Sequence, residues 1–99
     1  METTTTNKLD INITIVSLSY LDKLDAGDIF LFSTTGPKYV FLRRTPDGRF
    51  SYMHTGTKRR YYRRLNRQVF NMDHNGGLFI ANGELFVDFK TAMACATRL

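Results

Sequence analysis

The sequence has little that could staple a fold or anchor it in a membrane. It contains one cysteine, Cys95, so no disulfide can form within the chain. Its longest uninterrupted apolar stretches, such as 29–32 and 85–87, are far shorter than the roughly 20 residues of a membrane-spanning helix. We therefore expect a protein of a reducing compartment, the cytoplasm (that of the host cell if the protein is viral), with no membrane partner.

The spacings typical of metal and catalytic sites are also missing. His54 and His74 are twenty residues apart, and Cys95 has no second cysteine to share a metal with. Asp22, Asp25 and Asp28 recur at intervals of three without the pattern of a calcium loop, and we interpret them as capping or solubilising residues. We expect no enzyme, no metal and no cofactor, with a divergent nuclease that uses aspartates as the alternative.

The size of the chain indicates one domain. Its 99 residues, 42% of them hydrophobic and 13% aromatic, suffice for one compact core. Residues 1–7 include four consecutive threonines and lack the basic and apolar regions of a secretory signal. We predict a disordered tail over residues 1–8 and a single barrel-like domain over residues 9–99.

The first half of that domain reads as strands joined by a short connector. Residues 11–16 alternate Ile11, Ile13 and Ile15 with polar residues, the period of a half-buried strand. The leucine spacing in residues 17–28 indicates a turn or two of helix as a connector. Residues 29–32 form a short apolar run, which predicts a central strand buried on both sides.

A first hairpin is predicted from Thr45-Pro-Asp-Gly48, because proline and glycine favour the turn conformations that this sequence needs. The flanking strands are residues 39–44 and 49–54. Alternation predicts the following core-facing residues: Val40, Leu42, Phe50 and Tyr52. It places Tyr39, Phe41 and Met53 on the opposite face.

A second hairpin is predicted from Asn82-Gly83, which favours a two-residue loop between residues 78–81 and 84–89. This loop pairs Phe79 with Phe86. One face then carries the residues predicted to be core: Leu78, Ile80, Leu85, Val87 and Phe89. Residues 90–99 are predicted to form a short helix or an extension that covers Phe79 and Phe86; alternatively, these two rings support a homodimer.

Charge is concentrated in the middle of the chain. The net charge is +5, yet residues 38–67 hold ten basic residues against one acidic residue, Asp47, a local charge of +9. Eight of the ten are arginine, which suits bidentate contacts to anions better than lysine does. A solvated edge strand that uses charge to prevent aggregation is the alternative.

The most basic stretch, residues 58–67, interleaves arginines with Tyr61 and Tyr62, so that phosphate donors lie beside rings able to stack on bases. We favour a strand over a helix here, because a cationic first turn opposes the helix dipole. The candidate residues for binding nucleic acid or another anion are Arg43, Arg44, Arg49, Lys58, Arg59, Arg60, Tyr61, Tyr62, Arg63, Arg64 and Arg67.

The order of these elements across residues 21–70 resembles SH3-like small β-barrels, above all the accessory proteins of tailed phages that act against host defence. The resemblance implies a small, partly open barrel. Together with the two hairpins and the short C-terminal helix predicted from the residues, it indicates a mainly β fold. It also implies a binding function. We expect the partner to be DNA or RNA backbone, with an acidic protein surface or a small nucleotide, such as a cyclic oligonucleotide, as alternatives.

Overall fold

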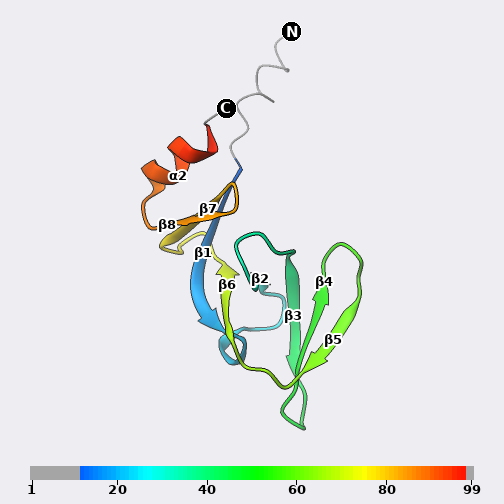
Figure 1. The fold of residues 1–99 in the computed structure, drawn as a ribbon. Coiled ribbons are helices and arrows are strands. Elements are labelled where there is room, and N and C mark those ends of the chain that lie inside the picture. Colours follow the sequence, from blue (N-terminus) through cyan, green and yellow to red (C-terminus); the bar gives the residue numbers. More distant parts are fainter. Residues whose placement is uncertain (1–11, 98–99) are drawn as a thin grey trace.

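The computed structural model describes residues 12–97, so the predicted tail over residues 1–8 and Ile11 lie outside the described residues. The fold is one antiparallel sheet of eight strands in the order β5-β4-β3-β2-β6-β1-β7-β8, with a helix at one end (Figure 1). The elements are β1 (Ile13–Tyr20), the 3-10 helix η1 (Leu21–Lys23), β2 (Ile29–Leu31), β3 (Tyr39–Arg44), β4 (Phe50–His54), β5 (Arg60–Arg63), β6 (Gln68–Met72), β7 (Leu78–Ala81), β8 (Glu84–Phe86) and α2 (Phe89–Ala96). The mainly β class is confirmed, and the sheet is not closed into a barrel.

Strand β1 is longer than the sequence pattern predicts. The predicted connector over residues 17–28 starts later than expected, because residues 17–20 continue the strand by pairing with β6. One helical turn, η1, remains of that connector, and Leu18 is half exposed. The fully buried residue of β1 is Val16, whereas the alternating pattern placed the isoleucines on the buried face. Strand β1 lies inside the sheet, with β6 and β7 on its two sides.

Strand β2 lies in the interior of the sheet, as predicted. It pairs with β3 on one side and β6 on the other. Phe30 is fully buried in a cluster that we call the Phe30 cluster: Leu21, Leu24, Phe30, Phe41, Phe50, Tyr52 and Val69. Its neighbour Leu31 is buried in a separate cluster with Val16 and Ile80. The strand is therefore buried on both faces.

Strands β3 and β4 pair in a register that the sequence pattern missed. The Thr45–Gly48 turn forms as expected, with Gly48 at φ +86° and its N–H donating to the Thr45 carbonyl over 3.0 Å. However, a β-bulge between Phe41 and Arg43 places Phe41 opposite Tyr52. Phe41 is therefore buried, whereas Val40 and Leu42, predicted to be core, are half-buried.

Strand β6 was not predicted, and it joins the two parts of the sheet. It pairs with both β1 and β2, and its Val69 is almost completely buried. The segment over residues 64–67 leads to it from the edge strand β5. This segment is fixed on η1, where the Leu21 N–H donates to the Arg67 carbonyl over 3.2 Å and the Asp22 N–H donates to Asn66 Oδ1 over 3.3 Å.

Strands β7 and β8 pair in the register expected of a two-residue loop, with Phe79 opposite Phe86. The predicted core face is wrong at its far end, because β8 stops at Phe86 and Leu85, Val87 and Phe89 are exposed by 41%, 80% and 46%. The chain leaves the sheet there to start α2.

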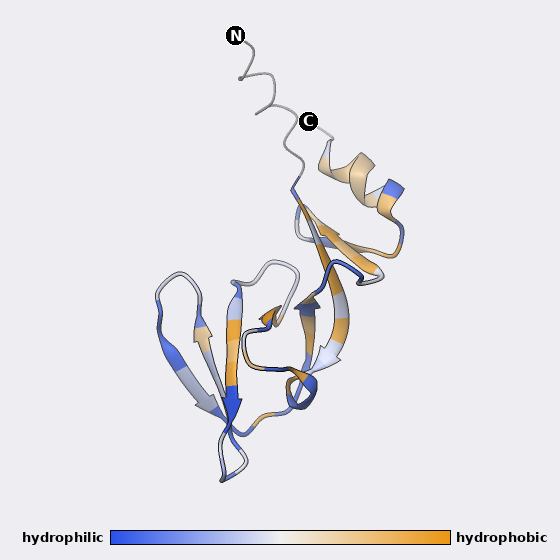
Figure 2. Ribbon diagram, turned by 180° about the vertical axis from the view of Figure 1, so that it is seen from behind, coloured by the Kyte–Doolittle hydropathy of each residue, from blue (hydrophilic) through white to orange (hydrophobic). Residues whose placement is uncertain are grey.

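Helix α2 begins after Asp88, whose side chain accepts a hydrogen bond from the Thr91 N–H over 3.0 Å. The helix packs on β7 and β8, where Ala92 and Cys95 lie in a cluster with Ala81, Phe79 and Phe86. The prediction of a short helix over these phenylalanines is confirmed, and the helix occupies the face on which a homodimer was the alternative. In Figure 2 this end of the sheet is largely hydrophobic, while β5 at the other end is hydrophilic.

The buried state of Phe30 generates a stability prediction. Its ring lies 5.2–5.7 Å, centroid to centroid, from the rings of Phe32, Tyr39 and Tyr52. Phe30→Ala should lower the free energy of unfolding by about 3–5 kcal/mol, measured by urea denaturation, because it opens a cavity in the core. Val87→Ala, at an 80% exposed position, should change it by less than about 0.5 kcal/mol. A loss above about 1.5 kcal/mol in the Val87 variant would instead support the core face predicted from the sequence.

Candidate functional site

Strands β2, β3, β4 and β5 pair with one another in chain order and form a meander. Its last two strands, β4 and β5, place their side chains alternately on the two faces of the sheet. Tyr52 lies opposite Tyr61, and Phe50 lies opposite Arg63, so these four share one face, which we call the pocket face. Met53 lies opposite Arg60, and Ser51 opposite Tyr62, on the opposite face. Neighbouring residues of β5 therefore point away from each other.

Four aromatic rings gather on the pocket face. Tyr52 and Tyr61 stack, with 5.4 Å between centroids and 19° between planes. Phe32 lies edge-on to Tyr39 at 5.3 Å and to Tyr52 at 5.5 Å. The rings come from β3, β4, β5 and the residue after β2, so the meander brings them together.

Two arginines extend along these rings from different parts of the chain. The guanidinium of Arg63, on β5, lies 5.5 Å from the centroid of Tyr61. That of Arg67, just before β6, lies 4.9 Å from the centroid of Phe32. Arg59 contributes a third guanidinium, 6.0 Å from the Tyr61 centroid. Each contact is a cation–π pair that holds a flexible side chain in place.

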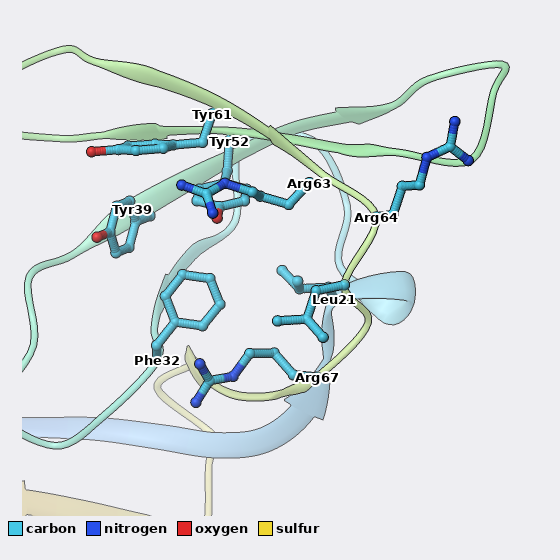
Figure 3. A pocket seen from close by; sticks show the side chains of 9 residues that line it. Leu21, Phe32, Tyr39, Tyr52, Tyr61, Arg63, Arg64 and Arg67 are labelled. Carbon is cyan, nitrogen blue, oxygen red and sulfur yellow. The ribbon is translucent and has the colours of Figure 1, made fainter.

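The rings and arginines surround a pocket of about 270 Å³ (Figure 3). Its lining consists of the four aromatic residues described above together with Leu21, Leu65, Arg63, Arg64 and Arg67. Among the described residues, none of those lining it is acidic. In Figure 3 the side chains of Arg63 and Arg67 extend beside the pocket, whereas Arg64 points away from it.

Arg64 points away because it is held, with Arg49, by Asp47. The Asp47 carboxylate lies 3.2 Å from Arg49 Nε and 3.8 Å from Arg64 Nη2, and Arg64 Nη1 donates to the Asp47 carbonyl over 3.2 Å. A hydrogen bond from the Thr45 hydroxyl and the two guanidiniums lower the pKa of Asp47. Two of the ten cations in residues 38–67 are thus partly neutralised.

The structure brings together part of the predicted site. Tyr61, Arg63 and Arg67 converge at the pocket, and Arg59 lies near the Tyr61 ring without lining the pocket. Arg43, Arg60 and Tyr62 lie on the opposite face, because they are opposite Ser51, Met53 and Ser51 in the ladder. Arg44 shares the face of Phe50 but donates to the Asp22 carbonyl over 3.3 Å, beside η1.

Lys58 lies in the turn between β4 and β5. It adopts a left-handed backbone conformation at φ +66°. The turn is organised by His54, whose Nδ1 accepts hydrogen bonds from the N–H groups of Gly56 and Thr57, each over 3.0 Å. His54 therefore has a structural role at the end of β4.

The aromatic half of the pocket was missed by sequence reasoning. Tyr39 was predicted to lie away from the core, Tyr52 was predicted as core only, and Phe32 and Leu21 were not singled out. The signal that could have found them is the register, since Tyr52 opposite Tyr61 fixes which face of β5 meets the core. The unpredicted bulge in β3 accounts for Tyr39, because it reverses the face of the residues that precede it.

The pocket has the chemistry of a site for a planar or anionic group. Burial has the largest effect on the Tyr52 hydroxyl and raises its pKa, so the hydroxyl stays protonated. Aromatic cages also bind quaternary ammonium groups, but guanidiniums at the wall repel a cation. Stacking surfaces and positive charge together favour a ligand that is flat, negatively charged, or both.

Comparison of the chain with known protein families, with curated proteins and with solved structures finds no match. The site is therefore described by its geometry alone. Within residues 12–97, no three His, Cys, Asp or Glu side chains are grouped as metal ligands. The described part of the chain also contains no helix long and apolar enough to cross a membrane.

The raised pKa of Tyr52 predicts a loss of stability in alkali. A group whose pKa is raised by folding stabilises the native state below its unfolded pKa, here 10.0, and this contribution disappears as pH rises through the folded value. The melting temperature should therefore fall more steeply as pH rises above 10.0 in the native protein than in Tyr52→Phe. Tyr62→Phe, at a half-exposed position, is the matched control and should keep the native slope.

Proposed function

We propose that this protein binds nucleic acid through the pocket face, with its arginines on the phosphates. The observation that carries the proposal is the convergence of Arg63 and Arg67, each stacked on an aromatic ring, at one pocket whose lining includes no acidic residue among those described. Arg59 extends the same positive surface along β5.

The stacked arginines are well suited to bind phosphate. A guanidinium that lies over a ring keeps its N–H edge for hydrogen bonds while the ring restricts its motion. Less conformational entropy is then lost when it binds, and two parallel hydrogen bonds to a phosphate give direction as well as affinity. Contacts of this kind position a nucleic acid without reading its sequence, so we expect little base specificity from them.

Two finer interpretations belong to the same proposal. The meander from β2 to β5 is consistent with an SH3-like barrel that remains open, because β5 pairs with β4 on one side and with no other strand within residues 12–97. A cytoplasmic, phage-encoded factor that acts against host defence is the biological role that this resemblance suggests.

An acidic protein surface is the competing partner, since arginine and tyrosine also dominate protein interfaces. Affinity purification from lysate, with and without nuclease treatment, separates the two. Nucleic acid that co-purifies and is lost after nuclease supports the proposal. A stoichiometric protein that resists nuclease would favour the alternative.

Because arginines lie on both faces of the sheet, a pair on the pocket face can be compared with a pair on the opposite face. Arg63→Gln with Arg67→Gln should weaken binding of a labelled oligonucleotide about 100-fold or more at 50 mM salt, because each of the two lost charge-assisted hydrogen bonds is worth about 1.5–3 kcal/mol. The slope of log affinity against log salt should become shallower by about 1.4–1.8, which is about 0.7–0.9 for each lost phosphate contact. Fluorescence anisotropy at several salt concentrations measures both.

The control is Arg43→Gln with Arg60→Gln, the same charge change on the opposite face. It should leave affinity within about threefold of the native protein, because long-range attraction alone is lost. Equal losses in the two double variants would show that net charge, and not the pocket face, governs binding. Absence of binding by the native protein at low salt would refute the proposal altogether.

Asp47 provides a test in the opposite direction. Asp47→Asn removes the carboxylate that partly neutralises Arg49 and Arg64, and it should increase affinity about two- to fivefold at low salt. Asp88→Asn is the matched control, because it makes the same charge change at the far end of the sheet and asparagine caps a helix as well as aspartate does. The same gain in both variants would mean that Arg49 and Arg64 do not contact the ligand.

A further inference from the structure

The pocket has two walls of similar construction. One wall is the stacked pair of Tyr61 and Arg63, backed by Tyr52. The other is the pair of Phe32 and Arg67. In Figure 3 these pairs lie on two sides of the pocket, and the hydroxyl of Tyr61 points in the same direction as the guanidinium of Arg63. Flat surfaces thus line a space that also has hydrogen-bond donors at one end.

The size of this space suits a single ring system. Pockets for drug-sized ligands measure roughly 300–1,000 Å³, and this one is smaller, at about 270 Å³. A flat heterocycle with an attached phosphate suits this pocket, because its ring can stack while its phosphate contacts a guanidinium. A long double helix does not suit it, since its bases are stacked on each other and present no free face.

The pocket also lies where a strand of nucleic acid would have to pass. Arg59 lies just before the edge strand β5, Arg63 is the last residue of that strand, and Arg67 lies on the segment that crosses from β5 to β6. A backbone that contacts these three arginines runs past the mouth of the pocket. One base can therefore turn into it without a change in the phosphate contacts.

We infer that the pocket takes one unpaired nucleobase, stacked against the rings of its walls, and that the protein therefore prefers single-stranded nucleic acid to duplex. This inference rests on the proposed function and goes beyond it, because phosphate contacts alone would not distinguish the two forms. The base is held by its flat face and by the arginine beside its phosphate, so purines and pyrimidines are both accepted.

The test compares a labelled 12-nucleotide single strand of DNA, the corresponding duplex and a free nucleoside monophosphate, with the full-length native protein at low and moderate salt. The single strand should bind at least tenfold more tightly than the duplex. Since the chain contains no tryptophan, tyrosine fluorescence reports on the rings directly, and stacking of a base should quench it.

Tyr61 and Tyr62 form a matched pair of positions, adjacent in β5 and on opposite faces. Tyr61→Leu should lower single-strand affinity about 5- to 150-fold, the range seen for the loss of one stacked base, and leave duplex affinity nearly unchanged. Tyr61→Phe should retain the preference, and Tyr62→Leu should behave as the native protein. Circular dichroism and melting curves confirm that the variants fold.

The outcomes separate this inference from the proposed function. Equal affinity for single strand and duplex, with a normal salt dependence, would overturn the inference while nucleic-acid binding stands. No binding of any nucleic acid at low salt would remove both. Tight binding of the free monophosphate, with quenching that Tyr61→Leu abolishes, would support the pocket and identify its ligand as a small nucleotide.

Discussion

The packing of aromatic rings around Phe30 is the constraint on which the rest of the structure depends. Phe30 lies on β2, a strand of three residues, and its completely buried ring contacts side chains from both neighbouring parts of the sheet. Because one side of this ring cluster is core and the other side opens to the surface, the same residues stabilise the fold and form the pocket wall. Tyr52 belongs to both: it is a member of the Phe30 cluster and it stacks on Tyr61. The rigidity of the candidate site therefore comes from the core itself.

The bulge in β3 determines which side chains of that strand share the pocket face. Next to the turn, Arg43 lies opposite Ser51, on the far side from the pocket, and one extra residue between Phe41 and Arg43 then places Phe41 opposite Tyr52. Regular alternation from the turn would have put Leu42 in that place and left Phe41 facing away from Tyr52. The bulge thus exchanges an aliphatic side chain for an aromatic one on the pocket face. A cationic segment that looks uniform in the sequence becomes two surfaces of different character, one with an aromatic floor and one without.

Sequence patterns were informative where the physics is local, and failed where it depends on distant partners. Thr45-Pro-Asp-Gly48 and Asn82-Gly83 carry their own turn geometry, and both turns are found where expected. A strand over residues 60–63 was correctly preferred to a helix. In contrast, β6 has an unremarkable sequence and is a strand because β1 and β2 flank it. The arginines could be identified from composition and their alternation along a strand from its period of two, but which of the two sides meets the aromatic rings could not, since that follows from cross-strand register.

The crossing from β5 to β6 links the pocket to the seam of the sheet. Residues 64–67 carry Leu65 and Arg67 of the pocket lining, and they are tied to η1 by backbone hydrogen bonds. If β6 detached from β1 and β2 in a partial unfolding event, this segment would lose its anchor and the pocket would lose one wall. The free energy needed to open the pocket in this way is therefore the free energy needed to open the β6 ladder. Amide hydrogen exchange in β6 and pocket integrity are expected to report on one cooperative unit, while α2 can fray independently at the other end.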